Sequence, residues 1–196
     1  MLAQVRRFLD EVVRPAEAEI EAHEGDRDVL VGQIIHMRKQ AKERGLWLPH
    51  MPEELGGMGL GHVAMAAVSA EAAKTRFGPF ALNAQAPDEG NMHTLLHWAT
   101  PEQRERYLVP LCEGRVRSCF AMTEPEVAGS DPTLIQTTAV RDGDEWVVNG
   151  HKWFISGARG ASFAILIART ETNPELPEAA NSAFLVDRPS EGWEGV

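Results

Sequence analysis

The stretch "TLIQTTAVRDGDEWVVNGHKWFIS", Thr133 to Ser156, decides the fold because the hydrophobic periodicity changes there. β-branched and aromatic residues fill three short runs, 133–140, 145–149 and 152–156, and such runs are typical of strands. Asp142-Gly143 separates the first two runs and favours the positive φ angles of a tight hairpin turn. Asn149-Gly150 predicts a second turn, so we expect an antiparallel meander over residues 133–156.

The rest of the chain divides around this meander. Downstream, residues 162–170 predict a strand that is buried on both faces and residues 182–188 predict one more, with an exposed loop between them. Upstream, apolar residues recur at three- and four-residue steps and predict four or five helices before residue 115. Pro15 should kink or restart the first helix, Gly45 should stop the second, and "TPEQ" from Thr100 is a capping box. Helices followed by strands indicate an α+β fold, with an all-helical domain over 1–116 and an antiparallel, barrel-like β domain over 117–196.

Composition limits the function classes. The chain has 196 residues, 43% hydrophobic and 24% charged, as ordinary globular proteins do. A formal net charge of -10 argues against binding to nucleic acid, which needs a concentrated positive field, but leaves room for one anionic cofactor. Cys112 and Cys119 lack metal or redox spacing and are expected to be free buried thiols. The amphipathic N-terminus is no secretory signal and no apolar run approaches the ~20 residues of a membrane span, so we expect a cytoplasmic protein.

Most motifs that suggest catalysis are incomplete. The glycines of "LGGMGLG", Leu55 to Gly61, follow no strand, so they predict a connector between helices and not a nucleotide loop. His93 and His97 share a helix face, but Thr94 stands where a zinc protease has its glutamate, which favours a structural or solvated pair. Ser130 has no histidine near it in sequence to make it a nucleophile. The acidic residues are scattered as on a solvated surface, so we assign no catalytic residue and no metal site.

Two segments remain, "CFAMTEPEVAGSD" from Cys119 and "NGHKWFISGA" from Asn149. Each is expected to be a strand with a hydroxyl residue at its polar end, Thr123 or Ser156, and with large apolar side chains beside it. Apolar walls with a few placed hydrogen-bonding groups suit a planar heteroaromatic cofactor. The alternative is structural, since "TEPE" also fits a helix capping box and aromatic strands commonly fill cores. Residue chemistry leaves both interpretations open.

At these residues the sequence resembles the acyl-CoA dehydrogenase family. "AMTEPEVAGSD" is similar to the family's Thr-Glu-Pro-x-Ala-Gly-Ser-Asp flavin loop, and "VVNGHKWFISGA" is similar to its Asn-Gly-x-Lys-x-x-Ile-Thr segment. "MPEELGGMGLG" and "PEQRERYLVPLCEGRVRSCFAMTEP" match its helical domain in order and spacing. "APDEGNM" points to the subfamily of human members ten and eleven. The resemblance covers nearly all of the chain.

The resemblance implies a fold and an activity. Members of the family have a helical domain, a middle β domain and a C-terminal four-helix bundle, with FAD between the last two. They convert an acyl-CoA thioester into a trans-2-enoyl product and pass the electrons to an electron-transfer flavoprotein. Members are dimers or tetramers, so a homo-oligomer is implied for the complete protein.

Roles can be carried over from the family to matching positions. Residues 120–130 would line the pyrimidine edge of the flavin, with Met122 and Thr123 contributing backbone and hydroxyl hydrogen bonds. Phe154 would pack on the isoalloxazine and Ser156 would offer its hydroxyl to N5, while Ser130 would also contact substrate. The cofactor-binding set implied in this way is Phe120, Ala121, Met122, Thr123, Ala128, Gly129, Ser130, Phe154, Ile155 and Ser156.

The chain departs from the family pattern in several places. Val127 is an extra residue in the loop, Phe154 replaces a common Trp, and Ser156 replaces a common Thr. The family's catalytic base is a Glu in the C-terminal bundle, and we expect that bundle and the last strands of the middle domain to lie outside this sequence. We therefore expect a fragment of an acyl-CoA dehydrogenase that is inactive alone and binds FAD weakly. An acyl-CoA oxidase of the same fold and a non-catalytic scaffold of this fold are the alternatives.

Overall fold

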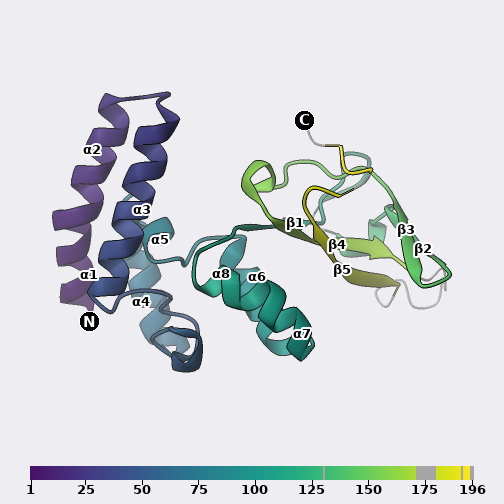
Figure 1. The fold of residues 1–196 in the computed structure, drawn as a ribbon, viewed down its shortest axis with the longest axis horizontal. Helices are drawn as coiled ribbons and strands as arrows, with labels where there is room; N and C mark the ends of the chain where they lie inside the picture. Colours follow the sequence, from purple (N-terminus) through teal and green to yellow (C-terminus); the bar gives the residue numbers. More distant parts are fainter. Residues whose placement is uncertain (130, 171–179, 191, 195–196) are drawn as a thin grey trace. The chain divides into compact units, whose positions relative to one another are not determined.

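The computed structural model describes residues 1–129, 131–170, 180–190 and 192–194. Internal contacts divide the chain into two units, Met1–Arg115 and Val116–Val196 (Figure 1). The first unit is helical and the second contains the strands, so the α+β class expected from sequence is confirmed. No helix in the described part of the chain is long and apolar enough to cross a bilayer.

The helical unit begins with a nearly continuous helix. α1 (Leu2–Phe8) leads through a π-helical segment, η1 (Leu9–Val13), into α2 (Arg14–Ala22). Pro15 is the second residue of α2, directly after the π-helical segment, and the backbone remains helical through Val13 and Arg14. The expected kink or restart at Pro15 is thus a change from the π-helical to the α-helical pattern, and the helix does not break there.

The remaining helices of this unit follow clear start and stop signals. Asp26 caps α3 (Arg27–Glu43) by accepting hydrogen bonds from the Asp28 and Val29 amides, and Gly45 follows its end with φ +66°. Thr100 and Gln103 form the predicted capping box. The other elements are η2 (Glu53–Leu55), α4 (His62–Ala72), α5 (Gly78–Ala81), α6 (Asp88–Trp98), α7 (Pro101–Gln103), η3 (Arg104–Leu108) and α8 (Val109–Cys112).

The connector between η2 and α4 is irregular, as the sequence predicts for "LGGMGLG". Gly57 is needed there because a Cβ would lie 2.0 Å from the Met51 carbonyl oxygen. The connector therefore serves close backbone packing. Cys112 and Cys119 are both buried and, within the described residues, belong to no disulfide, as expected for the two thiols.

In the described residues of the second unit, the strands form one mixed five-stranded sheet. Its strands are β1 (Ser118–Ala121), β2 (Thr138–Asp142), β3 (Glu145–Asn149), β4 (Phe163–Arg169) and β5 (Asn181–Asp187). β4 is the centre: it pairs in parallel with β1, antiparallel with β5, and at its end, Arg169 with Thr138, it meets β2. β4 is almost wholly buried, as expected for residues 162–170. A further short helix, η5 (Ala158–Gly160), precedes it, and η4 (Pro132–Leu134) precedes β2.

Three expectations for this unit were wrong in detail. The sheet is mixed, because the long connection between β1 and β4 permits parallel pairing. It is not closed, since no described strand joins β3 or β5 to a further partner. The meander reduces to the β2–β3 hairpin around Asp142-Gly143, because 133–137 and 152–156 are not strands.

Candidate functional site

The end of β1 and the segment after β3 are joined directly. The Trp153 N–H donates to the Thr123 carbonyl oxygen at 3.0 Å. Both segments also anchor in one small core: Ala121 belongs to it with Ala139, Leu166 and Ala168, and Ile155 packs against it. Ala121 and Ile155 thus face the protein interior. Because both pack into one core, Thr123, which follows Ala121, and Lys152, which precedes Ile155, are held close together.

Thr123 presents its remaining polar atoms without partners. The residue is half-buried, and its carbonyl is its one polar group that a described residue engages. Within the described residues, neither its N–H nor its hydroxyl forms a hydrogen bond. A half-buried amide and hydroxyl without partners can serve an acceptor on a ligand, since such groups are costly to leave unsatisfied.

The loop after Thr123 fixes that side chain sterically. A Cβ on Gly129 would lie 2.5 Å from the Thr123 Cγ2 methyl, so only glycine permits this approach. Ala128 precedes it and is exposed, and Asp131 turns the chain by accepting from the Thr133 N–H and hydroxyl. The predicted role of Ser130 falls outside the described residues.

Phe154 adopts a conformation that is unusual for a bulky residue. Its φ is +51°, in the left-handed region, and its side chain is 82% exposed. The ring stacks on Trp153 with centroids 4.3 Å apart and a 30° interplanar angle. Backbone strain of this kind concentrates at functional sites, and here it holds an aromatic face outside the core, with Ser156 exposed two residues later.

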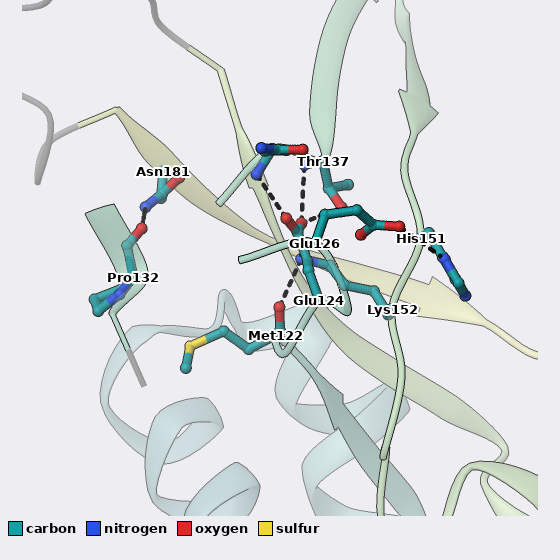
Figure 2. A network of polar contacts seen from close by, with 9 residues as sticks. Met122, Glu124, Glu126, Pro132, Thr137, His151, Lys152 and Asn181 are labelled. Carbon is teal, nitrogen blue, oxygen red and sulfur yellow. Dashed lines mark hydrogen bonds and ion pairs between the residues drawn. The ribbon is translucent and has the colours of Figure 1, made fainter. Parts of the chain in front are cut away.

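The centre of the site is a buried ion pair that our sequence analysis missed. Lys152 Nζ donates to Glu124 Oε1 and to the Met122 carbonyl oxygen, both at 2.8 Å (Figure 2). The two side chains are 9% and 1% exposed. The pair therefore ties the segment after β3 to the loop after β1 through side chains, in addition to the backbone bond.

Glu124 also forms hydrogen bonds with the residues that precede β2. Its oxygens accept from the Gln136 N–H at 2.7 Å, from the Thr137 N–H at 2.8 Å and from the Thr137 hydroxyl. The capping-box interpretation of "TEPE" was wrong, because no helix begins after Thr123. Glu124 bonds instead to residues twelve and thirteen positions further along. One carboxylate thus joins three stretches that are distant in sequence.

These donors set the charge of Glu124. Burial alone raises the pKa of its carboxyl, but the hydrogen bonds from Lys152, Thr137 and the Gln136 amide outweigh burial and lower that pKa to about 2. Burial is also the main influence on Lys152 and lowers the pKa of its ammonium, which Glu124 opposes. The Glu124 carboxyl is therefore ionised at neutral pH, and it forms a salt bridge with Lys152 Nζ.

This low pKa predicts acid sensitivity. Since an unfolded Glu has a pKa of about 4.3, the unfolded chain binds this proton at higher pH than the folded chain. Stability from Glu124 is therefore complete above about pH 5 and declines as pH falls towards 2, by about 3 kcal/mol in total. Urea unfolding at several pH values measures this, and Glu124→Gln should show a shallower slope below pH 5. Equal slopes for the two proteins would contradict it.

His93, one member of the predicted histidine pair, lies beside His50. The His93 ring lies against His50, with centroids 5.2 Å apart, and burial followed by repulsion from His93 lowers the pKa of His50 to about 4. Across the described residues, no group of three His, Cys, Asp or Glu side chains is placed to hold a metal ion. The absence of a metal site therefore remains our prediction for the whole chain.

A large open hollow lies beside these residues in the β unit. It has a volume of about 1460 Å³ and is lined by residues 150–155 and 157–160, by Thr137, by side chains from β3, β4 and β5, and by Trp193 with its neighbours. Thr123 and Phe120 do not line it. The unpartnered donors of Thr123 therefore do not line this hollow. Lys152 and Trp153 connect the two features, because they line the hollow and also bond to the carbonyls of Met122 and Thr123.

Each of the two units matches a family model of known proteins. Residues 1–115 match the family model "Acyl-CoA dehydrogenase, N-terminal domain", and residues 119–195 match "Acyl-CoA dehydrogenase, middle domain". Human acyl-CoA dehydrogenase family member 11 is 36% identical over 194 residues, which cover 95% of this chain and 24% of that protein.

Solved structures agree with this. A structure described as that of an acyl-CoA dehydrogenase from Mycobacterium abscessus is 35% identical with a TM-score of 0.87, over 97% of this chain and 50% of its own. The FAD complex of PigA is 25% identical with a TM-score of 0.72, over 97% and 48%. The chain spans about half the length of these structures and a quarter of the human relative. The chain belongs to the acyl-CoA dehydrogenase family.

Proposed function

We propose that this chain is the flavin-facing part of an FAD-dependent acyl-CoA dehydrogenase that converts an acyl-CoA thioester into a trans-2-enoyl-CoA. The observation that carries the proposal is the hydrogen bond from the Trp153 N–H to the Thr123 carbonyl at 3.0 Å. It joins the two segments that the family resemblance assigns to the flavin. Membership of the family and the likeness to an FAD complex support the same conclusion.

The residues present fit a flavin. An isoalloxazine has a polar pyrimidine edge, and the Thr123 amide and hydroxyl offer two donors with no partner within the described residues. It also has broad aromatic faces, and Phe154 holds its ring 82% exposed. When bound, the flavin supplies hydride acceptance. The chain contributes donors that stabilise negative charge on the ring edge, and the Ser156 hydroxyl adds one more.

Further parts of the proposal extend past these residues. Ser130 would contact the substrate, and we assign no residue of this chain as the catalytic base. Electrons would pass to an electron-transfer flavoprotein, and the complete protein would be a dimer or tetramer. A cytoplasmic location and a role in fatty-acid oxidation belong to the same proposal.

Flavin titration tests the proposal. We expect the chain to bind FAD weakly but measurably, as a change in flavin absorbance or fluorescence. Thr123→Val removes one hydroxyl at nearly constant shape and should weaken binding about tenfold, the equivalent of one hydrogen bond to a charged or polarised acceptor. Thr138→Val is the matched control, because Thr138 is an exposed threonine on β2. No binding by the unaltered chain, or equal losses in the two variants, would contradict the proposal.

A further inference from the structure

The contact between Lys152 and Met122 has a chemical consequence for Thr123. Lys152 Nζ donates to the Met122 carbonyl oxygen at 2.8 Å. That carbonyl and the Thr123 N–H belong to the same peptide group. A cation on the oxygen of a peptide draws electrons from its nitrogen, because the amide is conjugated, and so makes the N–H a stronger donor.

The next peptide group along the chain is held by the same segment. The Thr123 carbonyl accepts from the Trp153 N–H at 3.0 Å. Two successive carbonyls, those of Met122 and Thr123, are thus engaged by one short segment, Lys152-Trp153. Only the Lys152 contact lies on the peptide group that contains the Thr123 N–H; the Trp153 bond holds the neighbouring peptide in place. Within the described residues, the Thr123 N–H has no hydrogen-bond partner of its own.

Glu124 keeps the lysine charged and fixed without cancelling it. Its carboxylate is shared among several donors, the Gln136 amide and the Thr137 amide and hydroxyl as well as Lys152. The lysine side chain is 9% exposed, so it cannot turn freely into water. Burial makes its influence on the neighbouring peptide larger than that of a surface lysine.

We propose that Lys152 is a positioning residue that polarises the Met122–Thr123 peptide, so that the Thr123 N–H becomes a strong donor for an electron-rich ligand edge. Its relevance to a flavin rests on the proposed function. In that setting the effect is larger for the reduced, anionic ring than for the oxidised ring, because the donor faces developing negative charge. Lys152 therefore favours reduction without touching the cofactor.

Amide exchange separates this role from a merely structural one. An acidified N–H loses its proton to hydroxide more readily, so Lys152→Met should slow the exchange of the Thr123 amide, by about threefold to tenfold. A lysine that only holds the loop would give the opposite result, since a loosened loop exchanges faster. Lys152→Arg, which keeps the charge, should exchange at the rate of the unaltered chain.

Nuclear magnetic resonance of the whole 196-residue chain provides the readout and an internal control. The Trp153 N–H donates to the Thr123 carbonyl, so its protection from exchange reports whether the two segments stay bonded to each other. Slower exchange at Thr123 with continued protection at Trp153 is the expected result. Faster or unchanged exchange at Thr123 in Lys152→Met overturns the proposal.

Two further measurements keep the test decisive. If Lys152→Met does not fold, Lys152→Gln supplies an uncharged donor of similar length. In the unaltered chain, the Thr123 amide should exchange faster than the Met122 amide when each is normalised to its peptide reference, because Lys152 does not bind the preceding peptide. A slower Thr123 amide overturns the proposal even if neither variant folds.

Flavin binding distinguishes the two proposals. Lys152→Gln should lower the affinity for reduced FAD several-fold more than the affinity for oxidised FAD, whereas a structural loss lowers both equally. An equal loss of both overturns the role of Lys152 toward the flavin and leaves the proposed function standing. If the unaltered chain binds FAD in neither state, the proposed function fails, and the amide exchange result decides the polarisation alone.

Discussion

Replacing Glu124 with alanine is expected to lower the free energy of unfolding of the β unit by about 3–5 kcal/mol. The variant leaves the Lys152 ammonium buried with only the Met122 carbonyl, and it removes the acceptor of two backbone amides. An unpaired buried charge costs far more than the net value of the pair that it replaces. Hydrogen exchange of the β4 amides, which reads global opening of this unit, measures the loss.

Two companion variants make this prediction specific. Adding Lys152→Met to Glu124→Ala should restore part of the stability, because the unpaired charge is removed. Glu126→Ala is the matched control: Glu126 lies in the same loop, and its ion pair with His151 is exposed, so the change should stay within about 0.5 kcal/mol. Additive losses from Glu124 and Lys152 would show that no coupling exists.

The helical unit could be predicted well because its signals are local. Helix caps and breakers act within three or four residues, and Asp26, Gly45 and the Thr100 capping box lie where such rules place them. The hairpin at Asp142-Gly143 is equally local, with Gly143 at φ +61°. In both cases one short stretch contains all the information that the structure uses.

The site was harder because its decisive contacts are distant in sequence. Glu124 and Lys152 are 28 positions apart, and Glu124 and Thr137 are 13 apart. No periodicity links such residues, so the acids were interpreted as a solvated surface. The signal that existed was chemical: a Glu and a Lys stood inside two segments that were already assigned to one ligand. Requiring those segments to meet would have predicted a pair of opposite charges to join them.

Residues 152–156 show that the conformation of a segment can differ from the one that its composition favours. "KWFIS" has the composition of a strand, yet Phe154 takes a left-handed φ and Trp153 and Phe154 are both exposed. The composition of this segment favours an extended strand. Its actual backbone conformation is set by the bonds that Lys152 and Trp153 make to the loop after β1. The propensity for a strand is overridden by these tertiary bonds.

Asn149-Gly150 was interpreted as a turn, but the structure gives Gly150 another purpose. Gly150 has no positive φ, and a Cβ there would lie 2.1 Å from the Thr137 hydroxyl oxygen and 2.5 Å from its Cβ. Thr137 is 2% exposed and donates to Glu124 through both its amide and its hydroxyl. Gly150 is therefore required for the close approach that lets Thr137 reach the carboxylate.

Gly150→Ala is accordingly expected to cost about 3 kcal/mol, from overpacking together with the loss of at least one hydrogen bond to Glu124. Hydrogen exchange of the β4 amides measures the loss, and flavin affinity should fall with it, because the loop after β1 loses part of its support. Gly160→Ala is the matched control in the same unit, since its added Cβ meets no atom within 4 Å and its φ is not positive. If both variants were equally stable, close packing at Gly150 would not be what holds Thr137 against Glu124, and the network would have to be supported from the Lys152 side alone.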